Sequence, residues 1–232
     1  ALFDPGDVVI TEEFTFSWSL RIFYRFGARA FPVATDGDGM LPEALDHALE
    51  KLRKDRTRPK LIYTIPTFQN PMGWTMSLER RKKALDIART YGVPILEDDC
   101  YVDLRFEGED VTSFHSMDDT GQVLYVGSFS KIIAPGMRMG YMTAPPEVMD
   151  RVRVIKSGAG VNQFAAFAVH RYATSGLQDH IADINQVLRV KRDAMLAALG
   201  ESLGSAATWS RPGGALYVWL RMPAEADLTA TH

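Results

Sequence analysis

The chain has 232 residues, of which 46% are hydrophobic, 10% aromatic and 24% charged. This length and composition allow a buried core of one or two domains and argue against disorder, collagen and repeat arrays. The formal net charge is −3, so the composition gives no indication of a nucleic-acid partner or an anionic membrane surface.

Short β-rich runs alternate with amphipathic runs over the first 145 residues, which predicts an α/β fold with a largely parallel sheet. The strand candidates, in chain order, cover residues 8–10, 30–33, 61–65, 93–96 and 123–126. A helix is expected from Pro42 to about residue 54, because proline is tolerated in a first turn. Another is expected between Ser77, a suitable N-cap, and Gly92, a suitable residue to follow a helix.

Helical patterns dominate after Pro145-Pro146, over residues 147–157, 163–174 and 177–199, and a late strand is expected at 215–220. We therefore predict a first domain over residues 1–150, connecting helices over 151–200 and the start of a smaller α+β domain over 201–232. The chain begins without methionine and ends just after the late strand, so we expect a fragment lacking both ends.

Three polar clusters follow predicted strands, at residues 66–73, 97–101 and 127–131. Ligands of α/β proteins bind beyond the carboxyl ends of the strands, so these clusters should meet at one edge of the sheet. Asn70, which precedes a proline, also fits an ordinary turn. The three consecutive acids at 97–99 need a cation, a metal or hydrogen-bond donors, and a magnesium site is one alternative for them.

The third cluster supplies two hydroxyls and an amine from Ser128, Ser130 and Lys131, and Arg138 follows seven residues later. Hydroxyls and a guanidinium suit a phosphate monoester, although a solvated turn would have a similar composition. One ligand that could use all three clusters carries a phosphate, a reactive carbonyl, a ring nitrogen and a hydroxyl. Pyridoxal 5′-phosphate (PLP) combines these groups.

The sequence resembles the fold-type I, class I/II aminotransferases, and among them the 2-aminoadipate, kynurenine and aromatic aminotransferase branch. The resemblance covers nearly the whole chain. It is carried by an Asn-Pro, an Asp-x-x-Tyr and a Ser-x-Ser-Lys with a downstream Arg, within residues 4–9, 63–73, 97–101, 127–131 and 135–141. The resemblance implies a PLP-dependent transferase fold, with residues 1–150 as most of the large cofactor-binding domain.

The matching positions imply catalytic roles for three residues. Lys131 would form the Schiff base with the cofactor aldehyde and, once released, move the proton of the substrate Cα. Asp98 would pair with the pyridine nitrogen and keep it protonated, which makes the ring an electron sink. Tyr101, together with Asn70, would donate hydrogen bonds to the phenolate oxygen of the cofactor.

Four further positions are implied to bind the cofactor. Ser128, Ser130 and Arg138 match the phosphate-binding positions of the family. Phe16 falls where the family places an aromatic residue that stacks on the pyridine ring, but the local sequence departs from the common Pro-Thr-Tyr. A core position for Phe16 is the alternative.

The resemblance implies a homodimeric aminotransferase. It would move an amino group from an aromatic, 2-aminoadipate or branched-chain amino acid to a 2-oxo acid such as 2-oxoglutarate. Two alternatives remain on the same fold: the PLP-binding effector domain of a winged-helix transcription regulator, and a PLP-dependent lyase or decarboxylase. The N-terminal phosphate-binding loop of the family and its C-terminal arginine for the substrate carboxylate have no match within residues 1–232.

The remaining sequence features favour the cytoplasm and no metal. Cys100 is the single cysteine, which excludes an internal disulfide framework and fits a reducing compartment. The five histidines show no metal-ligand spacing, and Cys100 has no histidine at a catalytic spacing. No apolar stretch approaches the roughly 20 residues that a membrane-spanning helix needs, so no membrane partner is expected.

Overall fold

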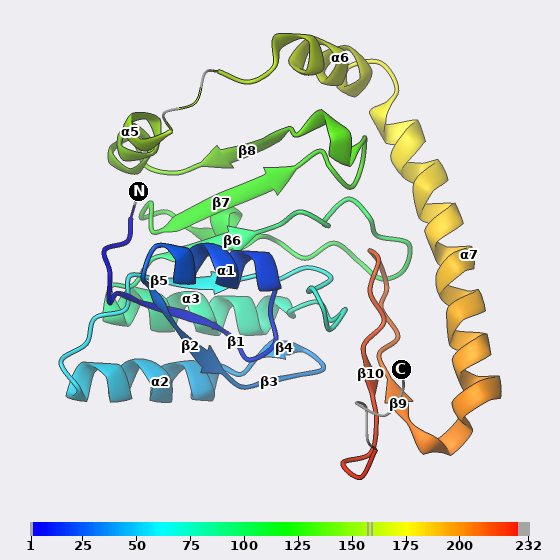
Figure 1. The fold of residues 1–232 in the computed structure, drawn as a ribbon, viewed down its shortest axis with the longest axis horizontal. Helices are drawn as coiled ribbons and strands as arrows, with labels where there is room; N and C mark the ends of the chain where they lie inside the picture. The colour runs from blue at the N-terminus through cyan, green and yellow to red at the C-terminus, as the bar shows by residue number, and fades with distance from the viewer. Residues whose placement is uncertain (1, 157, 159, 227–232) are drawn as a thin grey trace.

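A computed structural model describes residues 2–156, 158 and 160–226 of the chain. Its centre is a six-stranded sheet in the order β2-β1-β5-β6-β7-β8 (Figure 1). The strands are β1 (Val8–Glu12), β2 (Arg29–Val33), β5 (Leu61–Thr64), β6 (Ile95–Asp98), β7 (Val123–Ser128) and β8 (Gly140–Thr143). Every neighbouring pair is parallel except β7 and β8. The prediction of an α/β fold with a mostly parallel sheet is therefore confirmed.

Helices cover both faces of this sheet. Alternate residues of a strand point to opposite faces, and in β1 they pack into two separate cores: Val8 and Ile10 into one, Val9 into the other. The first core contains buried side chains of α2 (Pro42–Lys54) and α3 (Leu78–Tyr91). The second contains side chains of α1 (Ser17–Arg25) and α7 (Leu177–Leu203).

The ends of α3 lie where local sequence signals place them. The Ser77 hydroxyl accepts a hydrogen bond from the Arg80 backbone N–H, and Gly92 has a φ of 63°, a conformation that favours glycine. The Pro42 start of α2 is likewise as predicted. By contrast, α1 has no side-chain cap and was not predicted from the sequence.

The C-terminal part is helical first and then loop-rich. Helices α5 (Pro146–Ile155), α6 (Gln163–Ala173) and α7 follow one another along one end and one side of the sheet (Figure 1). The predicted end of the first helix at Ser157 lies outside the described residues. Short elements complete the chain: α4 (Phe114–Met117), the 3-10 turns η1 (Pro135–Met137) and η2 (Gly204–Ala206), the hairpin β3 (Thr35–Asp36) and β4 (Gly39–Met40), and the antiparallel pair β9 (Thr208–Trp209) and β10 (Leu220–Arg221).

The prediction of a strand over residues 215–220 is wrong except at Leu220, where β10 begins. The backbone just before and at the start of this stretch is bonded to a loop that follows β6 instead. Gly213 O accepts from Phe106 N at 3.0 Å and from Glu107 N at 2.9 Å, and Ala215 N donates to Leu104 O at 2.8 Å. These bonds dock the segment onto loop 104–107. No helix in the part of the chain that the structure describes is long and apolar enough to cross a membrane.

Candidate functional site

The three polar clusters lie at one edge of the sheet, as parallel strands require. Asp98 is the last residue of β6 and Ser128 is the last residue of β7, and these two strands are neighbours. The loop with Asn70 follows β5, on the other side of β6. Phe16 follows β1, the next strand along, and immediately precedes α1. The fold therefore brings the four segments to neighbouring positions on one rim.

Asn70 and Tyr101 are in direct contact. Asn70 Nδ2 donates to Tyr101 Oη at 3.2 Å, and both side chains are buried. The ring of Tyr217 meets the Tyr101 ring edge to face, with 5.9 Å between the centroids. Burial raises the pKa of Tyr101, so its hydroxyl stays protonated at neutral pH.

The Asp98 carboxylate accepts hydrogen bonds from two neighbours. Tyr63 Oη donates to Asp98 Oδ2 at 2.7 Å, and Cys100 Sγ donates to Asp98 Oδ1 at 2.8 Å. Burial raises the pKa of the Cys100 thiol, the charge of Asp98 raises it further, and the charge of Lys131 lowers it.

Ser128, Ser130 and Lys131 lie on the turn that leaves β7, and all three are half-buried. The turn is stabilised by a hydrogen bond from Ser130 N to Ser128 Oγ at 3.1 Å. It is further held by Phe129 N, which donates to Met139 O at 3.1 Å. Both serine hydroxyls and the lysine amine are therefore presented on one short segment.

Arg138 and Phe16 lie at the margin of this group. Arg138 is exposed, has a φ of 51° and donates from Nη1 to Pro135 O at 3.2 Å, so its guanidinium contacts its own loop in this structure. Phe16 is half-buried and packs against the core that contains Tyr63 and Tyr101. That contact agrees with either of the two roles considered for Phe16.

Glu12 is a buried residue of the site that the sequence analysis missed. Its Oε1 accepts from Thr64 Oγ1 at 2.6 Å and from Ile65 N at 2.9 Å, and its Oε2 accepts from Thr15 Oγ1 at 2.7 Å and from Gln69 Nε2 at 3.3 Å. Burial raises its pKa. The carboxylate joins the segment before Phe16 to the loop before Asn70. A charged residue ending an apolar strand was the signal that could have revealed it.

Arg81, on α3, fixes the same loop from its other side and was also missed. Its side chain is fully buried and donates to Pro66 O, Met76 O and Thr67 Oγ1, each at 3.0 Å. Burial lowers the pKa of this guanidinium. The backbone on both sides of Asn70 is therefore bonded to one side chain, which limits how far the loop can move.

The three consecutive acids bind three different sets of partners. Glu97 accepts from Phe114 N at 2.9 Å and His115 N at 2.8 Å, whereas the Asp99 carboxylate accepts from Tyr125 Oη at 3.2 Å. Within residues 2–156, 158 and 160–226, no group of three His, Cys, Asp or Glu side chains is arranged to hold a metal ion. The acids therefore do not form the magnesium cluster considered as an alternative.

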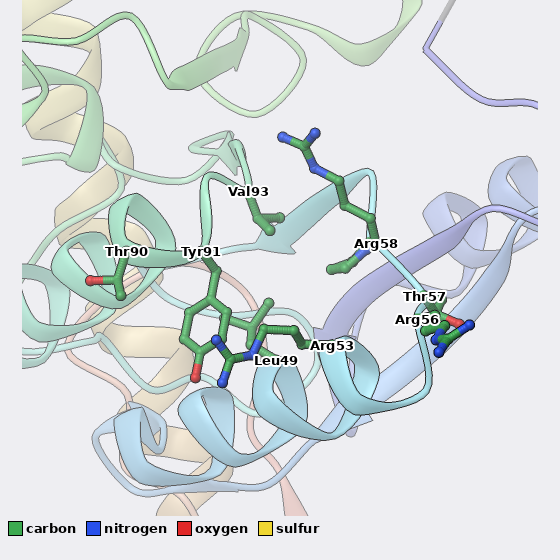
Figure 2. A pocket seen from close by; sticks show the side chains of 9 residues that line it. Leu49, Arg53, Arg56, Thr57, Arg58, Thr90, Tyr91 and Val93 are labelled. Atoms are coloured by element: carbon green, nitrogen blue, oxygen red, sulfur yellow. The ribbon is translucent and has the colours of Figure 1, made fainter.

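A separate cavity of about 440 Å³ lies at the opposite edge of the sheet, at the amino ends of β5 and β6 (Figure 2). Arg53, Arg56, Arg58 and Tyr91 are among its lining residues. Arg58 Nη2 donates to Gly92 O at 3.0 Å, just beyond the C-terminal end of α3. Basic side chains are favourable at helix C-termini, which accounts for the position of Arg58 without a ligand.

Comparisons with known proteins agree on one family. The family described as "Aminotransferase class I and II" matches residues 1–232. Aromatic-amino-acid aminotransferase 1 of Thermococcus litoralis is 36% identical over 227 residues, which are 97% of this chain and 54% of that protein. The uncharacterized HTH-type transcriptional regulator YisV of Bacillus subtilis is 33% identical over an alignment of 225 residues that covers 94% of this chain and 45% of that protein.

Solved structures give the same result. The crystal structure of Pyrococcus horikoshii kynurenine aminotransferase, in complex with PMP, has a TM-score of 0.95 and 34% sequence identity. The match covers 98% of this chain and 57% of that one. The chain therefore spans about half the length of the relatives it matches.

Proposed function

The chain belongs to the class I and II aminotransferases, and on that premise we propose that it is the central part of a PLP-dependent aminotransferase. The observation that carries the proposal is the position of two side chains. Asp98 ends β6, and Lys131 lies on the turn that leaves the neighbouring strand β7. A carboxylate and an amine at adjacent strand ends are the pair that this cofactor needs.

The polar side chains at the carboxyl ends of the strands match the chemical groups of PLP. Asp98 offers a carboxylate for a ring nitrogen, Asn70 and Tyr101 offer an amide and a protonated phenol for an oxygen, and Lys131 offers an amine for an aldehyde. The hydroxyls of Ser128 and Ser130, with the guanidinium of Arg138, suit a phosphate. When bound, the cofactor supplies an electron sink for the negative charge that develops at the substrate Cα.

The residues of the chain then have distinct tasks. The Asp98 carboxylate would hold a positive charge at the ring nitrogen. The Tyr101 hydroxyl, which accepts a hydrogen bond from Asn70, would donate to the cofactor oxygen. Lys131 Nζ would take the proton from the Cα of the bound amino acid and donate it to the former aldehyde carbon of the cofactor, because an amine in a half-buried site can serve as base and then as acid. Phe16 is the proposed ring-stacking residue.

We propose an amino acid of the aromatic, 2-aminoadipate or branched-chain type as the donor and a 2-oxo acid as the acceptor. The names of the Thermococcus and Pyrococcus relatives support this choice. A homodimer is supported by large apolar side chains that α1 and α6 expose, including Trp18 at 60% and Phe164 at 89%. The single cysteine supports a cytoplasmic location.

A regulator is the second candidate, because the Bacillus regulator is similar over 94% of the chain. One experiment on the complete protein separates the two candidates. It is treated with borohydride, digested and searched for cofactor attached to Lys131, and it is then assayed with a panel of amino acids and 2-oxoglutarate. We expect labelling of Lys131, and turnover with at least one donor.

Matched variants complete this test. Lys131→Ala should lose both the label and nearly all turnover, while Lys83→Ala, which removes an exposed lysine paired with Glu79 on α3, should retain both. Asp98→Asn should retain the cofactor and slow proton transfer. Labelling of Lys131 without turnover, in a protein that also binds DNA, would favour the regulator. An unlabelled Lys131 would refute both candidates.

A further inference from the structure

The Asp98 carboxylate is held by a hydroxyl from the neighbouring strand. Tyr63 lies opposite Leu96 in the register of β5 and β6, and its Oη donates to Asp98 Oδ2 at 2.7 Å. Only 2% of Tyr63 is exposed. The edge of the Phe23 ring packs against it, with 5.5 Å between the centroids. The phenol is therefore fixed by packing as well as by its hydrogen bond.

A second hydroxyl continues the chain of hydrogen bonds. Ser19 Oγ donates to Tyr63 Oη at 3.0 Å, which leaves the hydrogen of Tyr63 free to point at Asp98. Ser19 lies in the first turn of α1, and its backbone N–H donates to Phe16 O at 3.1 Å. The bonds connect the segment of Phe16 to the carboxylate of Asp98 across two strands.

We propose that Ser19 and Tyr63 form a hydroxyl relay that positions Asp98 toward the ring nitrogen of the cofactor. This inference rests on the function proposed above. Tyr63 and Ser19 act through Asp98, and they are positioning residues. The relay occupies Oδ2 with a strong donor. Among the residues that the structure describes, Oδ1 accepts only from the thiol of Cys100, which is a weak donor that a cationic N–H can replace.

The charges around the relay agree with a donating Tyr63. Burial raises the pKa of Tyr63 well above its usual value, and the negative charges of Asp98 and Glu12 raise it further. The negative charge of Asp99 raises the pKa of the neighbouring Cys100 thiol, and the positive charge of Lys131 lowers it. Tyr63 therefore keeps its proton at neutral pH, and that proton is available for the hydrogen bond to Asp98.

The test uses the complete, cofactor-loaded protein and three variants. Tyr63→Phe removes the donor to Asp98 and Ser19→Ala removes the donor to Tyr63. Tyr91→Phe is the matched control, because Tyr91 Oη also donates to a carboxylate, Asp46, at 3.0 Å, but on the far side of the molecule between α3 and α2. Cofactor content and borohydride labelling of Lys131 are measured first in the wild-type protein. If the wild-type protein shows neither, the proposed function is refuted; the relay is judged from the variants of a protein that does bind the cofactor.

The readouts are steady-state kinetics and the pH midpoint of the visible absorbance of the bound cofactor. A carboxylate that has lost its orientation holds less positive charge on the ring. We therefore expect the midpoint of Tyr63→Phe to move up by about half a pH unit or more. A hydrogen bond to a charged group is strong, so kcat should fall roughly tenfold with KM changed by less than about threefold. Tyr91→Phe should change neither quantity.

The double variant distinguishes a relay from two independent structural effects. Ser19→Ala alone should lower kcat by about two- to fivefold, and it should have little further effect in the Tyr63→Phe background, because its effect passes through Tyr63. A Tyr63→Phe protein that keeps its cofactor at Lys131 with an unchanged midpoint and kcat would overturn the relay. If Tyr63→Phe does not fold, an unchanged midpoint and kcat in Ser19→Ala would overturn it instead.

Discussion

Glu12 Oε1, at the last residue of β1, lies 2.6 Å from Thr64 Oγ1 at the last residue of the neighbouring strand β5. Both side chains are buried, and the same carboxylate also binds Thr15 and Gln69. The contact therefore sets the distance between the chain segment that leads to Phe16 and the loop that carries Asn70.

Glu12→Gln should destabilise the protein. Four donors converge on the two carboxylate oxygens, and the amide of glutamine would turn an NH₂ group toward two of them. We expect a loss of about 2–4 kcal/mol in the free energy of unfolding, measured by urea denaturation. The control is Glu13→Gln at the exposed neighbouring position, which should cost less than about 1 kcal/mol. Equal losses in the two variants would contradict the role given to Glu12.

Two adjacent arginines should differ sharply in their contribution to stability. Arg81→Met leaves Glu97, 3.8 Å away, as a buried charge without its cation and leaves the loop acceptors unpaired, so it should cost about 3–5 kcal/mol. Arg80→Met removes a pair between a half-buried guanidinium and the exposed Asp36, and it should cost about 1 kcal/mol or less. Thermal and urea denaturation of the two variants check this order. An equally large loss of unfolding free energy in the Arg80 and Arg81 variants would show that burial of the guanidinium does not determine the size of the loss.

Glu97 should make the protein more stable as the pH falls through the neutral range. Burial raises its pKa from 4.5 to about 7, so between about pH 7 and 4.5 the folded state binds a proton that the unfolded state does not. Each pH unit lowered within this window should add up to about 1.4 kcal/mol from this group. Glu12 and Asp99 act in the same direction, because burial raises their pKa values as well.

The contribution of Glu97 is isolated by comparison with Glu97→Gln. The free energy of unfolding of both proteins is measured by urea denaturation at pH values from about 4.5 to 8. We expect the difference between them to change steadily from about pH 7 down to 4.5 and to be constant above that window. Parallel curves throughout would show that Glu97 titrates normally.

Gly214 should tolerate no side chain. A Cβ at this position would overlap the ring of Phe68 and the carbonyl oxygen of Leu104. Phe68 lies in the same loop as Asn70, so Gly214→Ala should destabilise the protein by about 1–3 kcal/mol and disturb the candidate site. The control is Gly200→Ala in α7, where a Cβ meets nothing within 4 Å. It should stabilise the protein by up to about 1 kcal/mol. Both values come from denaturation curves.

Local signals in the sequence determined most of the architecture. The alternation of β-rich and amphipathic runs predicted five strands of the sheet, because each strand or helix is recognised from a few consecutive residues. Pro42, Ser77 and Gly92 predicted helix ends, since capping depends on backbone and side-chain groups within one turn. The order of the motifs also identified the family. The roles of Lys131, Asp98 and the other proposed cofactor residues remain predictions.

Only the tertiary structure decided which partners these residues meet. Residues 213–215 bond to loop 104–107, and of the strand predicted over residues 215–220 only Leu220 lies in a strand; the sequence could not show that this loop offers the matching backbone groups. The farthest hydrogen-bond partners of Glu12, Arg81 and Tyr63 likewise lie 57, 31 and 44 positions away, at Gln69, Thr112 and Ser19. A buried polar group takes whatever donor or acceptor the fold places beside it, and that proximity is a property of the packed chain.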